Sequence, residues 1–361
     1  MSETTVEAPV PAADERDSRW TRLGRRTVRP PIYAEHQYLV VIGFVVLVAL
    51  VAPHIATSRS KQFLIDLWLV YAIAGIGFYW VFALAGRFAF CQTFMMTLGG
   101  FMSAWVTRSG HGKPFLLGVA SAIAITSLLA FVVGIIARRS QELYFAIATL
   151  AVTSIGADVF NHWDAFSGRN GTVTNVASPK LFGHAFLKDK QVFWLFLGAL
   201  TIVLLLAVLI ERSPFRRDAI ASRDNLLVAR LTGVAAGRHQ LVLFILGSAL
   251  GGLSGSMYAH WAGNVSTGTF GIDLAIGIFL MLFLGGVGSM WGPVLGAAFY
   301  VAIPQVLSNI QKYSSIVYGA LLLVVVMALP RGLVGLAQDG SRVVKDQVRK
   351  ARRKDIVDVA G

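Results

Sequence analysis

The chain has 361 residues, of which 55% are hydrophobic and only 14% are charged. Soluble domains typically carry about 25% charged residues, so this composition argues against a soluble domain and predicts an all-α, polytopic helical membrane protein. The net charge of +13 does not indicate nucleic-acid binding, because Lys and Arg are confined to loops and tails, as orientation by the positive-inside rule requires.

Residues 1–37 are polar and contain proline and six arginines. This composition predicts a disordered cytoplasmic tail that reaches the anionic inner leaflet. A cleavable signal peptide would bring its apolar region sooner, so we expect the first apolar run to act as an uncleaved insertion signal.

The membrane domain is predicted to span residues 38–330. A spanning helix needs about 20 apolar residues, and ten apolar runs fit this length, near 38–56, 63–85, 88–106, 115–137, 143–160, 192–210, 240–259, 272–287, 291–308 and 314–330. Ten spans place both ends on one side. Most of the 32 basic residues fall in the two tails, the short links at Arg87 and Arg138, and the 211–239 loop, so both termini are predicted to be cytoplasmic. The tail 331–361 is basic and is expected to lie near lipid headgroups.

Two loops stand out between the runs. The loop 161–190 is predicted to lie on the outer side, and its segment Ser167–Gly171 has the composition of a turn. The loop 211–239 is the longest polar break with a dense positive charge, so we expect it in the cytoplasm. Within it, Asp224–Leu231 is predicted to form a short amphipathic helix that ends at Gly233. A short helix with an apolar face outside the membrane needs a partner, which we interpret as a soluble motor subunit.

Signatures of catalysis and nucleotide binding are missing from the sequence. It has no P-loop pattern, no Ser, His and Asp set, and no metal-spaced pair of histidines inside a run. We therefore expect no catalytic residue, no metal and no cofactor in this chain. The single cysteine, Cys91, excludes an intramolecular disulfide framework.

Small and polar residues inside the runs have two readings each. The glycines Gly247, Gly251 and Gly255, and likewise Gly288, Gly292 and Gly296, recur every four residues, which favours close helix packing or, alternatively, faces that slide or hinge during transport. The polar residues Gln92, Thr93, Thr97, Thr149 and Thr153 either satisfy backbone carbonyls or line a substrate pathway.

Charged residues near the runs point away from ion-coupled transport. Asp66, Asp158 and Asp273 lie near run ends, where we interpret them as solvated helix caps. No acidic or basic residue falls in the middle of a run. Proton- or sodium-coupled transporters usually need such a group or a broken-helix ion site, so the energy source is expected elsewhere.

Several segments together resemble the permease subunits of bacterial ABC importers of the branched-chain amino acid type. The most specific is Gly285–Ala297, which reads GGVGSMWGPVLGA. The others are Tyr144–Ala151, Asn161–Gly171, Ser213–Gly233 and Pro330–Leu333, so the resemblance covers roughly 63–336. The chain departs from the family pattern at Gly86–Thr93, and it has Arg169 and Arg216 where the family has small residues.

The resemblance implies a permease in the bacterial inner membrane that works by alternating access within a complex. Its partners would be two ATP-binding subunits, which bind ATP and Mg, a second related permease, a periplasmic or lipid-anchored solute-binding protein, and membrane lipids. The loop 211–239 would couple to the ATPase through Arg223, Asp224, Asn225, Leu226, Leu227, Ala229 and Gly233.

Two other classes of function remain as alternatives. The chain could be a stand-alone secondary transporter or channel for a small solute, or a membrane-embedded enzyme, which the lack of a catalytic cluster disfavours. The substrate stays open among branched-chain amino acids, urea, short amides and other carboxylates.

Overall fold

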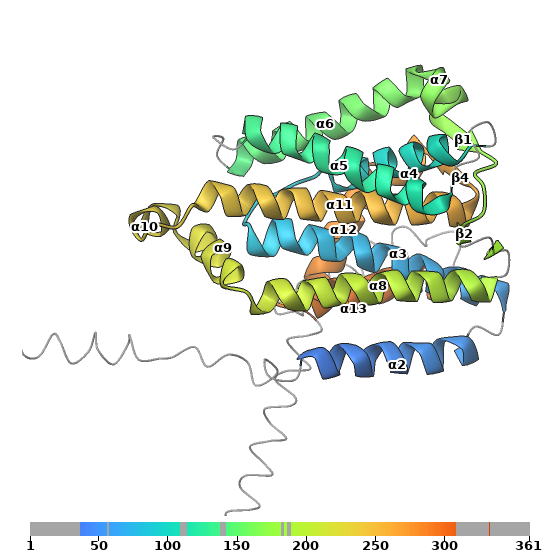
Figure 1. Cartoon of the computed structure of the whole chain (residues 1–361), viewed down its shortest axis with the longest axis horizontal. Coiled ribbons are helices and arrows are strands. Elements are labelled where there is room, and N and C mark those ends of the chain that lie inside the picture. The colour runs from blue at the N-terminus through green and yellow to red at the C-terminus, as the bar shows by residue number, and fades with distance from the viewer. Residues whose placement is uncertain are drawn as a thin grey trace, which may run out of the picture.

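The computed structural model describes residues 37–55, 58–108, 114–137, 142–181, 184–185, 189–307 and Gly332. Within these ranges the chain is a bundle of long helices with short strands at one end (Figure 1). Apart from Gln37, the predicted tail 1–37 lies outside the described residues. The tenth apolar run, 314–330, and the tail 331–361 except Gly332 also lie outside them.

In the described part of the chain, nine long helices follow the first nine predicted runs. They are α2 (Gln37–Ile55), α3 (Arg59–Tyr79), α4 (Gln92–Thr107), α5 (Phe115–Ala137), α6 (Glu142–His162), α8 (Asp189–Arg212), α11 (Ala236–Ala262), α12 (Ile272–Gly285) and α13 (Trp291–Leu307). In lipid every backbone N–H and C=O must find its partner within the segment, which forces apolar runs of this length to be helical. Among the described residues, seven helices are long and apolar enough to cross a membrane, which confirms a polytopic helical membrane protein.

The third predicted run begins too early. Helix α3 continues as a π-helix, η2 (Trp80–Leu84), and residues 85–91 then form no helix before α4 starts at Gln92. The backbone turns at Gly86, whose φ of 68° is left-handed and favours glycine. We call residues 85–91 the first break, and residues 286–290, between α12 and α13, the second break.

Helix α11 lies in the middle of the bundle, packed against α3, α4 and α5 (Figure 1). Glycines allow this close packing: a Cβ on Gly247 would lie 2.5 Å from the carbonyl oxygen of Gly77 on α3. Helices α12 and α13 form an antiparallel pair against α3, because a Cβ on Gly285 would meet Gly292 and a Cβ on Gly296 would meet Met281. Trp68 of α3 also donates from Nε1 to the carbonyl of Val294 (2.8 Å).

The two ends of the bundle are built differently (Figure 1). At one end, α9 (Pro214–Asp224) and α10 (Leu226–Leu231) connect α8 to α11. At the other end lie α7 (Asp164–Ser167), the 3-10 helices η3 (Arg169–Gly171) and η4 (Thr267–Phe270), and the strands β1 (Thr172–Thr174), β2 (Lys180–Leu181), β3 (His184–Ala185) and β4 (Asn264–Ser266). Strand β1 pairs antiparallel with β4, Val173 opposite Val265, and β2 pairs antiparallel with β3. We call these the α9–α10 end and the strand end.

Candidate functional site

The α9–α10 end carries two helices where the sequence predicted one. Pro214 occupies the first position of α9, where its missing N–H costs nothing. The predicted helix Asp224–Leu231 starts too early, because Asp224 is the last residue of α9 and α10 begins at Leu226. Between them Asn225 is extended, and its Oδ1 caps α10 by accepting from the N–H of Val228 (3.1 Å). Gly233, with φ of 82°, ends the segment.

Helix α10 presents its apolar side chains to the outside of the bundle. Leu227 is 69% exposed and Leu231 80% exposed, with Leu226 and Val228 also exposed, whereas Ala229 is buried against the rest of the chain. A six-residue helix that holds four exposed apolar side chains at the tip of the molecule is an uncovered contact surface among the described residues. We call Leu226, Leu227, Val228 and Leu231 the α10 face.

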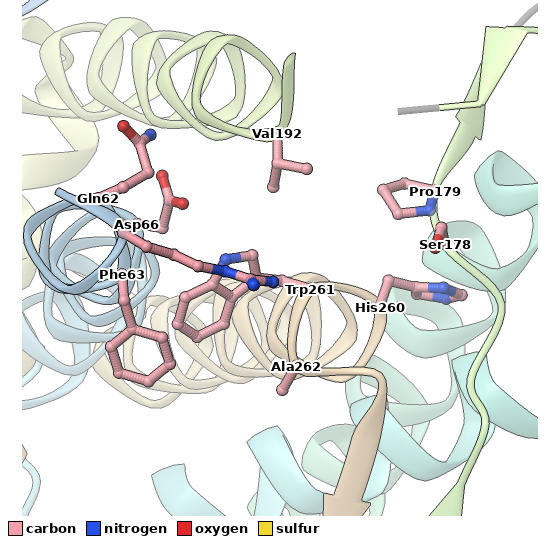
Figure 2. A pocket seen from close by; sticks show the side chains of 10 residues that line it. Gln62, Phe63, Asp66, Ser178, Pro179, Val192, His260, Trp261 and Ala262 are labelled. Carbon is pink, nitrogen blue, oxygen red and sulfur yellow. The ribbon is translucent and has the colours of Figure 1, made fainter. Parts of the chain in front are cut away.

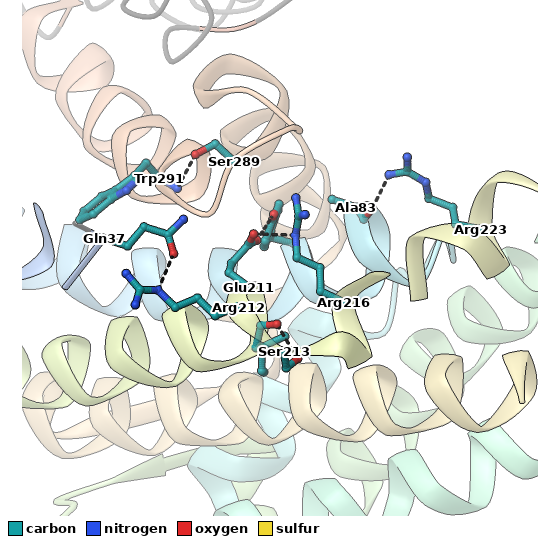
Figure 3. Close-up of polar contacts among 11 residues, drawn as sticks. Gln37, Ala83, Glu211, Arg212, Ser213, Arg216, Arg223, Ser289 and Trp291 are labelled. Atoms are coloured by element: carbon teal, nitrogen blue, oxygen red, sulfur yellow. Dashed lines mark hydrogen bonds and ion pairs between the residues drawn. The ribbon is translucent and has the colours of Figure 1, made fainter. Parts of the chain in front are cut away.

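A polar cluster ties the start of α9 to the membrane helices. Glu211, at the end of α8, accepts from the hydroxyl of Tyr79 (2.5 Å) and pairs with Arg216 of α9 (2.6 Å) (Figure 3). Arg212 lies over the ring of Tyr38 (4.2 Å from its centroid) and bonds Gln37, so α2 begins at this same end. The base of α9 is therefore fixed to α3 and α8, and α2 is attached to α8 beside it.

At the other end of α9, Arg223 reaches toward Ala83 (Figure 3), although its side chain stays 38% exposed. Its Nη1 donates to the carbonyl of Ala83 in η2 (2.5 Å), and its Nε and Nη2 both lie 2.9 Å from Oδ1 of Asp224. Its aliphatic chain rests on Gly86, where a Cβ would collide with it. Arg223 therefore bonds both η2 and its neighbour Asp224, and both residues belong to α9 rather than to the short helix that was predicted to start at Asp224.

The five polar residues predicted for a pathway are all buried and lie around the first break. Gln92 donates to the carbonyls of Ala74 (3.2 Å) and Gly247 (3.1 Å), joining α4 to α3 and α11. Thr149 Oγ1 accepts from the N–H of Phe90 (3.1 Å) and Thr153 donates to its carbonyl (3.3 Å). In this arrangement the side chains of Gln92, Thr149 and Thr153 form hydrogen bonds with backbone groups of neighbouring segments.

The remaining two threonines of that set lie on α4. Thr97 donates to the carbonyl of Thr93 one turn earlier (3.0 Å), whereas the buried hydroxyl of Thr93 has no hydrogen-bond partner among the described residues. Hydroxyls of this kind in lipid commonly bond carbonyls of their own helix.

The glycines lie at close contacts with one exception. A Cβ on Gly251 would lie 3.0 Å from the Cβ of Met95, and a Cβ on Gly255 would meet the backbone of Met96. Gly292 faces the backbone of Gly286, directly after α12, and Gly296 faces the backbone of Met281 in α12. Gly288, however, lies in the second break and has open space around it, so the prediction that it shares a helix face with Gly292 and Gly296 is wrong.

The strand end contains a polar pocket of about 350 Å³ between α3, α8, α11 and the segment that holds Ser178 and Pro179 (Figure 2). Asp66 lines it and is only 1% exposed, so the expected solvated cap is wrong for this residue, which faces the pocket from the second turn of α3. Asp158 and Asp273 are exposed. His260 lies beside the pocket, bonded to Ser103 (2.9 Å) and the carbonyl of Ala177 (2.7 Å).

Sequence reasoning missed two features of the first break. Arg87, assigned to a cytoplasmic link, is 8% exposed, bonds Gln240 on α11 through Nη2 (2.9 Å) and lies over the ring of Phe145 on α6 (5.1 Å). The π-helix before it gave no signal in the hydropathy. Gly86 followed by an arginine inside an apolar stretch was the one available sign.

Comparisons with known proteins agree with this architecture. Residues 63–326 match the family described as branched-chain amino acid transport system / permease component. The high-affinity branched-chain amino acid transport system permease protein LivM of Salmonella typhimurium is 24% identical over 327 residues, 84% of this chain and 76% of the relative. The permease protein LivH of Escherichia coli is 25% identical over 309 residues, 76% of this chain and 97% of the relative. No solved structure matches the chain.

Proposed function

Because the chain belongs to the family of branched-chain amino acid transport permease components, we propose that it imports a small amino acid or related organic solute by alternating access. It is a multi-pass membrane permease, and its relatives are permease components of ABC importers. A bacterial inner membrane is the compartment that this assembly requires.

The α10 face is the observation that supports coupling to an ATP-binding subunit. Its four exposed apolar side chains lie outside the bundle, where the described part of this chain does not cover them. A few side chains at the fully desolvated centre of an interface supply most of its binding free energy, and the four clustered side chains of the α10 face would form such a centre. Two ATP-binding subunits, which hold the ATP and Mg, would dock here.

Ten spans with both termini in the cytoplasm fit the described residues. The α9–α10 end is rich in arginine, as a cytoplasmic face requires. Helix α2 begins at this end, next to Arg212. Helix α13 ends at residue 307, at the strand end of the bundle, whereas Gly332 lies against Gly286 near the α9–α10 end. The predicted run 314–330 would cross the membrane between these two points as the tenth span.

The second permease of the complex would be a relative of this chain. Escherichia coli has two permease proteins of this transport system, LivM and LivH, and this chain matches both. A solute-binding protein would deliver the substrate at the strand end, where Asp66 and His260 border the polar pocket.

Co-purification with a docking variant tests the proposal. The full chain would be expressed with candidate ATP-binding subunits, a second permease and a binding protein from the same source, and captured through a tag on this chain. Wild-type protein is expected to retain the ATP-binding subunits. Leu227→Asp combined with Leu231→Asp puts charge on the α10 face and should reduce their recovery at least tenfold.

Arg217→Ala is the matched control, because Arg217 is exposed on α9 outside the α10 face. It should retain the subunits. ATP-independent uptake by the purified chain alone in liposomes would instead support a stand-alone secondary transporter or channel and sink the coupling assignment.

A further inference from the structure

The first break begins where the helical hydrogen-bond pattern widens. In η2 the N–H of Ala85 donates to the carbonyl of Trp80 (3.1 Å), and the N–H of Arg87 reaches back to Val81 (3.0 Å). A π-helical turn of this kind shifts the register, leaves carbonyls near the helix end for outside donors, and is frequent at functional sites. The carbonyl of Ala83 is the one that Arg223 reaches.

Arg223 is suited to join two moving parts. It is in the last turn of α9, directly before the extended residue Asn225 that separates α9 from α10. One nitrogen of its guanidinium bonds the carbonyl of Ala83, while the other two hold the carboxylate of Asp224. A planar group with donors fixed in a fork can do both at once, whereas a lysine ammonium cannot hold that geometry.

The far side of the first break is attached to three further helices. Arg87 bonds Gln240 on α11, and Thr149 and Thr153 on α6 hold both backbone groups of Phe90. At the end of the break, Gln92 opens α4 and bonds backbone of α3 and α11. A displacement of the carbonyl at Ala83 therefore reaches α4, α6 and α11 through hydrogen bonds.

We propose that Arg223 is a positioning residue that transmits movement of the α9–α10 segment to the first break, and through it to α4, α6 and α11. The inference rests on the proposed function, since it assigns the path by which docking at the α10 face alters the membrane helices. In this proposal Arg223 makes contacts within this chain, and the α10 face contacts the ATP-binding subunit.

Spin-label distances in the assembled importer test this relay without depending on the substrate. One label would be placed at Arg217→Cys on α9 and one at Leu143→Cys on α6, both exposed positions, in a Cys91→Ser background. With Arg223 present, α6 follows α9, so ATP should leave the distance between the labels unchanged. In Arg223→Lys, ATP should change that distance, because α9 moves without α6.

Transport gives the second readout. In proteoliposomes with radiolabelled leucine as the probe, Arg223→Lys should retain the ATP-binding subunits and their ATP hydrolysis, while uptake per ATP falls at least tenfold. Arg217→Ala should leave that ratio unchanged. Identical nucleotide responses of the label distance in wild type and Arg223→Lys would overturn the relay. Failure of the wild-type chain to retain any ATP-binding subunit would instead overturn the proposed function.

Discussion

Two breaks interrupt the membrane helices near the α9–α10 end, and they are held in opposite ways. At the first break and in the π-helix η2 that leads into it, side chains from α6, α9 and α11 bond backbone or side-chain groups, with Thr149, Arg223 and Gln240 among them. In the second break, backbone lies on backbone: a Cβ on Gly292 would collide with the carbonyl of Gly286, and one on Gly332 would collide with Gly286 from the other side.

This difference suggests that the first break can change its conformation during transport, whereas the second break is rigid. Side-chain hydrogen bonds can lengthen, rotate and form again as helices move. Glycine backbones in contact leave no spare volume, because interiors are packed to the density of organic crystals. We therefore expect substitutions at the second break to act on folding, and substitutions at the first break to act mainly on coupling.

The largest effect is expected where α13 meets α12. Gly296→Leu would drive a side chain into the carbonyl of Met281, and overpacking of this kind costs about 3 kcal/mol or more. The variant should give little folded protein in detergent, measured as monodisperse yield and thermal midpoint. Gly43→Leu on α2, where a Cβ meets nothing within 4 Å, is the control and should melt like the wild type. Equal midpoints for the two variants would show that the contact between α12 and α13 has spare room.

Gly86→Ala, in the first break, should have the next largest effect. Two separate costs are expected from this substitution. A left-handed φ costs a non-glycine residue about 1–2 kcal/mol, and the added Cβ also displaces Arg223. Gly233→Ala supplies the first cost alone, since Gly233 has φ of 82° and open space around it. Both variants should lower the thermal midpoint, but only Gly86→Ala should lower uptake per ATP. A similar loss in Gly233→Ala would assign the effect to backbone strain.

Hydropathy predicted the helices well because lipid leaves the backbone no alternative. The run 115–137 became α5 with the same bounds, Phe115–Ala137. The first break was missed because Phe88, Ala89 and Phe90 are as apolar as any spanning segment, and tertiary bonds from Thr149 and Thr153 hold the backbone of Phe90 there. Helix α9 was missed because it is polar and is held by contacts far away in the sequence.

The sequence predicted a short exposed apolar helix near its observed position, but it did not predict that Arg223 and α10 make different contacts. Residue type and spacing marked Asp224–Leu231 as an exposed apolar helix, and Leu227 and Leu231 are exposed. The contact of Arg223 with the carbonyl of Ala83 could not be predicted from local spacing, because the two residues lie 140 positions apart in the sequence. Asp66 was misjudged for a similar reason, because burial near a helix end depends on which neighbours lie beside it.

Thr153→Val should show a smaller effect. It tests whether Thr153 stabilises the backbone of the first break or lines the substrate pathway. Thr153 donates both to the carbonyl of Thr149 in its own helix and to that of Phe90 in the first break. Losing the second bond is expected to cost about 1 kcal/mol of stability, with the apparent KM for leucine unchanged within twofold. The control, Thr201→Val on α8, removes a bond within one helix only, to Leu197. A large rise in KM for Thr153→Val would return this residue to the substrate pathway.

Asp224→Asn should have the smallest effect, and it decides which bond of Arg223 carries the coupling. The Asp224 side chain is 60% exposed, and exposed ion pairs contribute about 0–1 kcal/mol, so the thermal midpoint should barely change. Asparagine keeps an oxygen that accepts from Arg223, and the bond to Ala83 is untouched, so uptake per ATP should fall less than threefold. Salt screens an exposed pair, and wild type and variant should therefore converge as KCl is raised. If Asp224→Asn instead matched the tenfold loss expected of Arg223→Lys, coupling would run through the surface pair rather than through the carbonyl at the first break.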